Sequence, residues 1–172
     1  MTDIATAYNF DPTTGIGPYC DWSLAGPDLA SDQGLLSAVL ISLFTDRLAA
    51  ADDELPDNSG DRRGWWGDLP LDQANTGATP DLIGSRLWLL VRQKQTQAVL
   101  NAAIGYAREA LQWLIDDGVA ARIDVAGAWG GLGILKLGVT VSRVTAQGAT
   151  VNHGYDLAWN YTMNSLPRQA GA

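Results

Sequence analysis

Cysteine, histidine and long apolar stretches are scarce in this chain of 172 residues. Cys20 is the only cysteine, so no disulfide can form within the chain, which suits a reducing cytoplasm. One cysteine and one histidine far apart in the sequence cannot close a zinc site, and we expect no metal or cofactor. Residues 1–10 lack the basic region and apolar run of a signal peptide, and no apolar run is long enough to cross a membrane, so we expect no membrane insertion.

Basic residues are also few. The chain has 11 Lys and Arg against 19 Asp and Glu, for a formal net charge of −8. Binding to a nucleic-acid backbone requires clustered cations, so we expect no nucleic-acid partner. Charged residues make up 17% of the chain, which is below the usual quarter. This low charge density hints that part of the surface is buried against partner proteins.

Candidate catalytic groups are sparse and isolated. His153 lies in a predicted strand, with no sequence near it that resembles a nucleophile elbow. A glycosidase needs two carboxylates, and the sequence places no second acid beside Glu109 on its predicted helix. Residues 130–133 are rich in glycine but lie between predicted strands, so they do not form a phosphate loop. A further acidic run departs from calcium-loop spacing and is predicted to be a solvated turn. Its members are Asp52, Asp53, Glu54, Asp57 and Asp61.

The N-terminal half alternates between irregular and helical sequence. Residues 1–33 carry many turn signals and are predicted to form an irregular arm, with one possible short strand over residues 19–24. Apolar residues at helical spacing predict a helix over 33–50. Residues 51–80 lack any periodicity and form a long loop, which its tryptophans indicate is ordered by contact.

The C-terminal half is predicted to be one long helix followed by an antiparallel sheet. The helix covers 81–118 and starts at Thr79-Pro80-Asp81, and the sequence allows a break near residues 92–95. Three alternating strands follow over 119–161, with a glycine-rich loop at 127–133. The last two strands are joined by a hairpin at Gln147-Gly148. The predicted fold is therefore α+β, with two helices on a small antiparallel sheet in a single domain over 1–172.

Tryptophan is unusually frequent, with seven in the chain. Two are adjacent in the segment Asp61-Arg62-Arg63-Gly64-Trp65-Trp66-Gly67-Asp68. Neighbouring indoles point in different directions, and Trp and Arg are enriched in interface hot spots. The segment either contacts another protein or pins the loop to its own domain, and the residues alone favour neither. The interface hypothesis names Arg62, Arg63, Trp65, Trp66 and Asp68.

Several segments together resemble a known family. They are Ala38–Arg47, the acidic turn with Leu55-Pro56, the block Asp61–Asp68, then Gly84–Leu90 and Glu109–Leu114. Over residues 20–145 the chain is similar to a baseplate protein family of Mu-like phages. That family is similar to the lysozyme-like wedge subunits, or sheath initiators, of other contractile tails. Many of those carry a Glu-Pro-Arg motif after the long helix. This chain has Asp116-Asp117-Gly118-Val119 there, so the contacts of that motif are not transferred.

The resemblance implies a non-enzymatic subunit of the virion's tail baseplate, built in the host cytoplasm. Its partners would be other wedge proteins, hub or tube proteins and the sheath subunit. The last strand offers a free edge to another chain, and we expect Val151, Tyr155, Leu157 and Trp159 to take part in that docking.

Two other functions remain open. One is a tail-associated peptidoglycan hydrolase that uses Glu109 or Asp68. The other is a small soluble adaptor outside any phage.

Overall fold

The computed structural model describes residues 3–4, 6–9, 19–22, 24–29, 31–32, 35–57, 59–68, 82–145 and 147–160. The chain divides into two compact units, residues 1–41 and 42–172, which are treated separately below. The single-domain organisation therefore stays a prediction.

The first unit contains three short antiparallel ladders. Strand β1 (Asp3–Ile4) pairs with β6 (Ser31–Asp32), and β2 (Thr6–Asn9) pairs with β3 (Tyr19–Trp22). A tight hairpin joins β4 (Leu24–Ala25) to β5 (Asp28–Leu29) through Gly26, whose φ is +66°. The described part of the arm is thus not irregular as predicted, because its residues form paired strands. The short strand predicted over 19–24 is found as β3 and the start of β4.

Helix α1 spans Leu36–Phe44 and is shorter than the predicted 33–50. It ends there because the following residues pair with a distant segment. The amide of Ser85 donates to the carbonyl of Thr45 at 2.9 Å, and the amide of Arg47 donates to the carbonyl of Ser85 at 3.0 Å. These bonds form a parallel bridge between Asp46 and Ser85, an extended geometry that a helix cannot provide.

The predicted long helix is three separate pieces. The 3-10 helix η1 (Arg86–Leu90) comes first, followed by α3 (Gln97–Leu111) and α4 (Trp113–Asp116). The predicted break near 92–95 is confirmed, since Thr96 caps α3 by accepting from the amide of Val99. The proposed start at Thr79-Pro80-Asp81 lies outside the described residues.

Glycine in the middle of α3 offers a simple test of this helix. Gly105 is exposed, and a Cβ added there would meet nothing within 4 Å. Alanine at this position is expected to raise the free energy of unfolding by about 0.5–1 kcal/mol, because it restricts the unfolded chain more than glycine does. Urea denaturation of Gly105→Ala measures the gain. A loss of stability would contradict the helical placement of Gly105.

Three strands form the sheet of the second unit in the order β7-β8-β9. They are β7 (Arg122–Gly131), β8 (Ile134–Val144) and β9 (Thr150–Asn160), all antiparallel. The glycine-rich loop predicted at 127–133 is wrong: β7 continues to Gly131, and only Leu132-Gly133 forms the turn. The predicted hairpin turn at Gln147-Gly148 is confirmed, with Gly148 at φ +79°.

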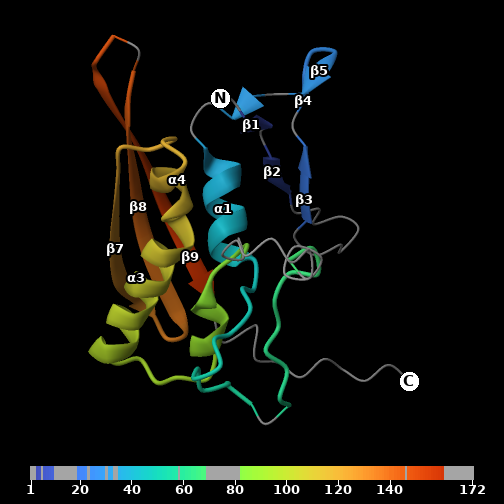
Figure 1. Cartoon of the computed structure of the whole chain (residues 1–172), viewed down its shortest axis with the longest axis vertical. Coiled ribbons are helices and arrows are strands. Elements are labelled where there is room, and N and C mark those ends of the chain that lie inside the picture. The colour runs from blue at the N-terminus through green and yellow to red at the C-terminus, as the bar shows by residue number, and fades with distance from the viewer. Residues whose placement is uncertain are drawn as a thin grey trace, which may run out of the picture. The chain divides into compact units, whose positions relative to one another are not determined.

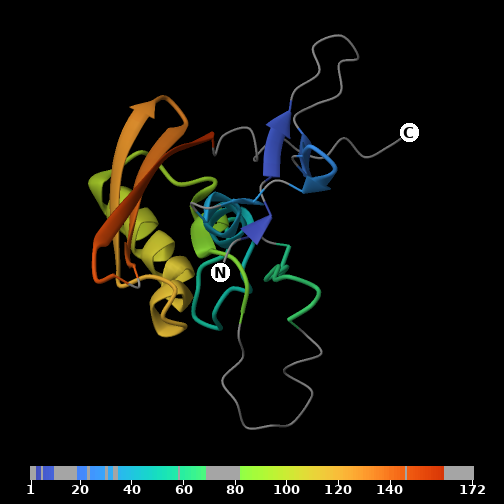
Figure 2. The same cartoon turned by 90° about the horizontal axis from the view of Figure 1, so that it is seen from above.

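Helix α3 lies along β7 on one face of the sheet (Figures 1 and 2). The inward side chains of β8 form the centre of the core, and each is at most 1% exposed. They are Leu135, Leu137, Val139 and Val141. The predicted α+β class is confirmed. No helix among the described residues is both long and apolar enough to cross a membrane.

Candidate docking surfaces

The segment containing the adjacent tryptophans is held by its own chain. Arg62 reaches back to the turn at residues 49–51, where its guanidinium donates to the carbonyl of Ala50 and, at 2.8 Å, to that of Ala51. The backbone joins this contact, since the amide of Ala49 donates to the carbonyl of Arg62 at 3.0 Å. Arg62 therefore stabilises the local loop.

Arg63 is also committed to contacts within the chain. It adopts a left-handed φ of +52°, and its guanidinium lies 2.7 Å from the carboxylate of Asp46. The same guanidinium carbon lies 4.4 Å from the ring centroid of Trp88, a cation–π contact. The indole of Trp88 in turn donates to the carbonyl of Arg47 at 2.9 Å. Arg63 thus fastens the segment over a buried tryptophan.

A tight turn separates the environments of the two adjacent tryptophans. The amide of Asp68 donates to the carbonyl of Trp65 at 3.1 Å, and the ring of Trp65 lies directly over Gly67. Asp68 is 6% exposed, and its Oδ1 accepts from the amide of Ile83 at 3.3 Å. Trp65 is half-buried, but Trp66 is 77% exposed. Trp65 therefore packs within its own chain, whereas the contact of Trp66 with another protein stays a prediction.

The structure also contains a charged cluster that the sequence analysis missed. Arg86 bonds the carboxylate of Asp53 at 3.0 Å and that of Glu109 at 2.7 Å, and it lies 4.7 Å from the ring centroid of Tyr106. Burial opposes the charge of Arg86, but its hydrogen bonds to Glu109 and Asp53 and their negative charges outweigh burial and raise the pKa of the guanidinium. Glu109 is thus an ion-pair partner, which does not fit a glycosidase acid held protonated in an apolar pocket.

The acidic run contributes to local structure. Besides its ion pair, Asp53 accepts from the amide of Ala50, and Asp57 accepts from the hydroxyl and amide of Ser59. Those two hydrogen bonds lower the pKa of Asp57. Across the described ranges, no three acidic, histidine or cysteine side chains gather closely enough to hold a metal ion.

Strand β9 is an edge of the sheet. Its neighbour is β8, and no other described strand pairs with it. The amide of Thr145 donates to the carbonyl of Ala149, so these opposite residues form a hydrogen-bonded pair. In an antiparallel ladder every second pair is hydrogen-bonded, so the odd-numbered residues of β9 bond to β8. The even-numbered residues from Thr150 to Asn160 direct their N–H and C=O groups to the open side. At the opposite edge, the carbonyl of Val125 accepts from Arg108, which agrees with the same alternation.

The docking residues predicted on β9 lie on the inner side of this strand. Tyr155, Leu157 and Trp159 are half-buried opposite the core residues of β8, and only Val151, near the hairpin tip, is 40% exposed. His153 shares this inward face, as predicted. The groups of β9 that are open to another chain are therefore the backbone of its free edge and Val151 near the hairpin tip. Tyr155, Leu157 and Trp159 instead pack against the core of the sheet.

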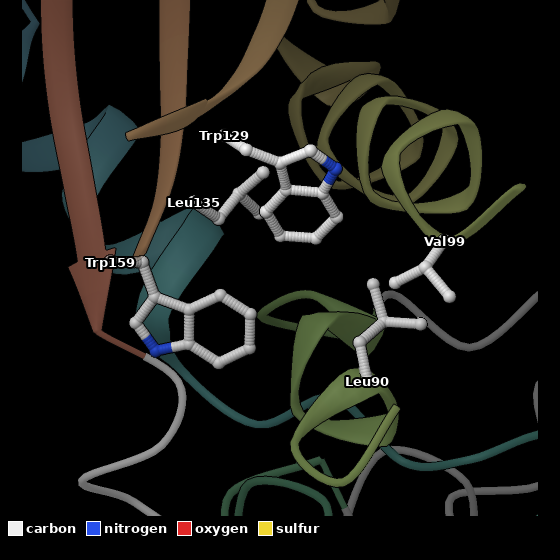
Figure 3. A pocket seen from close by; sticks show the side chains of 5 residues that line it. All are labelled: Leu90, Val99, Trp129, Leu135 and Trp159. Carbon is white, nitrogen blue, oxygen red and sulfur yellow. The ribbon is translucent and has the colours of Figure 1, made fainter. Parts of the chain in front are cut away.

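Trp159 also lines a shallow apolar hollow between η1, α3 and the sheet, which has no room for a water molecule (Figure 3). Its other lining residues are Leu90, Val99, Trp129 and Leu135. These side chains bring no charged group that could act as an acid or base on a substrate.

Comparison with known proteins gives the family. The model of the family described as phage protein GP46 matches residues 35–150. The chain belongs to that family. Baseplate protein gp46 of Escherichia phage Mu is 47% identical over 125 residues, covering 73% of this chain and 76% of that protein. The Mu-like prophage FluMu protein gp46 of Haemophilus influenzae is 36% identical over 160 residues, covering 93% of this chain and 99% of the relative.

Membership of the GP46 family confirms the resemblance to a baseplate protein family of Mu-like phages. The matched range contains that block, the Arg86 cluster and the strands β7 and β8. It ends at residue 150, where β9 begins, although the relative from Haemophilus influenzae covers nearly the whole chain.

Proposed function

We propose that this chain is a non-enzymatic structural subunit of a phage tail baseplate, carried in the virion after assembly in the host cytoplasm. Within that role, it joins wedges around the hub or tube of a contractile tail and initiates assembly of the sheath. Its partners are other wedge proteins, hub or tube proteins and the sheath subunit. The name of the Mu relative, a baseplate protein, supports the coarse role.

The observation that carries the finer role is the open edge of β9. An edge strand presents unpaired N–H and C=O groups, and an extended segment of another chain can satisfy them by strand addition. The strand has 11 residues, so its edge is long enough for a stable ladder. Its exposed side chains include Asn152 and Asp156, which keep the edge soluble until a partner arrives.

The contacts of Glu109 and Asp68, the two candidate catalytic acids, support the non-enzymatic role. Glu109 is engaged by Arg86, and Asp68 accepts a backbone amide within its own chain. A pair of catalytic carboxylates would need one acid kept protonated and a second facing the same substrate.

A proline on the open edge tests strand addition. Proline at Asp156 removes one N–H from the side of β9 that faces away from β8, so the β8–β9 ladder stays intact. We expect the circular dichroism spectrum of Asp156→Pro to show that the variant folds. When it replaces the wild-type chain, we expect it to be missing from purified particles. Asp156→Thr is the matched control, because it removes the same carboxylate and keeps the N–H. Particles that take up both variants equally would contradict docking at this edge.

A further inference from the structure

Among the residues that the structure describes, Trp66 has the most exposed aromatic side chain. It is 77% exposed, whereas Trp113 is 38% exposed and donates from its indole to Ser42. An indole is the largest apolar side chain, and burying it against a partner removes more apolar area from water than burying any other residue. Trp66 contributes little of that burial to the fold of its own chain.

The backbone on both sides of Trp66 is fixed. On one side, Arg63 is held by Asp46 and Trp88. On the other side, Asp68 is held by the amide of Ile83 and by the turn to Trp65. A side chain presented from a fixed backbone loses less conformational entropy on binding than one on a mobile loop.

The indole of Trp65 packs against that of Trp66. The ring centroids of Trp65 and Trp66 lie 5.2 Å apart with a tilt of 43°, and Trp65 is half-buried over Gly67. This tilted aromatic pair limits the directions that the exposed indole can take. The rest of the block therefore holds one aromatic side chain outward.

Charge indicates the chemistry of the surface that would meet it. The segment from residue 50 to 68 carries six carboxylates and two arginines. Both arginines, Arg62 and Arg63, are bonded to groups of their own chain. Arg63 is exposed, but its charge is paired with that of Asp46. Among the described residues of the segment, the exposed charges that have no ion-pair partner are carboxylates, including Asp52, Glu54 and Asp61. Complementarity therefore favours a basic partner surface.

We infer that Trp66 is the anchor of a contact in which its indole enters an apolar pocket, bordered by lysine or arginine, on a different baseplate protein. Arg62, Arg63 and Asp68 are positioning residues for that anchor and do not themselves touch the partner. This inference rests on the proposed baseplate function and narrows the predicted five-residue interface to one contacting side chain.

A photo-crosslinking amino acid at position 66 tests the contact in the phage that encodes this chain. Leu132, in the β7–β8 turn, is 93% exposed and provides the control position. We expect purified particles to contain a covalent adduct between position 66 and one other baseplate protein, with lysine or arginine in the crosslinked peptide. The probe at position 132 is expected to yield no adduct with that protein.

Competition between variants measures the size of the effect. When wild-type and variant chains are supplied equally, Trp66→Ala is expected to enter particles on the order of 30-fold less than wild type, as for loss of a hot spot. Leu132→Ala is expected to enter equally, and Trp66→Phe to recover much of the loss. The melting temperature of purified Trp66→Ala should match that of wild type, because the side chain is mostly exposed.

Three results would overturn the inference. They are equal incorporation of Trp66→Ala and wild type, an adduct only with a second copy of this chain, or a crosslinked peptide without basic residues. In each case the chain is still present in particles, so the proposed baseplate function stands. Absence of the wild-type chain from particles would instead reject the proposed function itself.

Discussion

Replacing Gly84 with alanine is expected to lower the free energy of unfolding by about 3 kcal/mol or more. Gly84 has φ +100°, which side chains other than glycine rarely adopt. A Cβ there would lie 3.0 Å from the amide nitrogen of Arg47 and would overlap the carbonyl of Thr45. These two groups make the hydrogen bonds to Ser85, so the clash falls on the bridge that joins residues 45–47 to η1. Urea denaturation followed by circular dichroism measures the loss.

Gly60→Ala separates backbone strain from this clash. Gly60 also has a positive φ, +73°, but a Cβ there would meet nothing within 4 Å. Only the left-handed conformation is penalised, at about 1–2 kcal/mol. If Gly84→Ala costs no more than Gly60→Ala, the close approach of the two backbone segments is wrong.

Replacing Arg86 with glutamine is expected to cost about 2 kcal/mol of stability, because two carboxylates lose a charged hydrogen-bond donor. The side chain of Asp53 is only 12% exposed, so water solvates it poorly once Arg86 is gone. The cation–π contact with Tyr106 is lost as well. Thermal and urea unfolding of the purified chain give the change.

An exposed ion pair in the same unit provides the control. Arg122 and Asp124 lie 2.6 Å apart, but their side chains are 72% and 51% exposed. Arg122→Gln is therefore expected to cost less than about 0.5 kcal/mol, as is usual for solvated pairs. Similar costs for the two substitutions would mean that the Arg86 cluster does not link residue 53 to α3 in solution.

Periodicity predicted the sheet well, because alternating apolar residues in β8 and β9 report burial of one face directly. It failed at residues 127–131, where glycine and alanine suggested a loop. The structure shows that Gly127 sits in β7 opposite Leu100 and Ile104 of α3, where small size permits close packing. Helix α1 was predicted too long for a different reason: the bridge from Asp46 to Ser85 joins residues far apart in sequence.

The candidate site was predicted only in outline. The unusual composition of residues 61–68 indicated a surface role, but composition does not say which way each side chain points. The hydrogen-bond partners of the Arg63 and Asp68 side chains lie 15 or more residues away along the chain, and those of the Arg86 side chain lie 23 and 33 away. Such pairings have no local signal, so the division between positioning residues and the exposed Trp66 required the structure.

Cryo-electron microscopy of purified particles tests the central claim most directly. The account predicts density for this chain in the baseplate ring around the tube, with an extended strand of another protein beside β9. The chain's absence from particles, together with its accumulation as a free monomer in the lysate, would contradict a structural role in the baseplate.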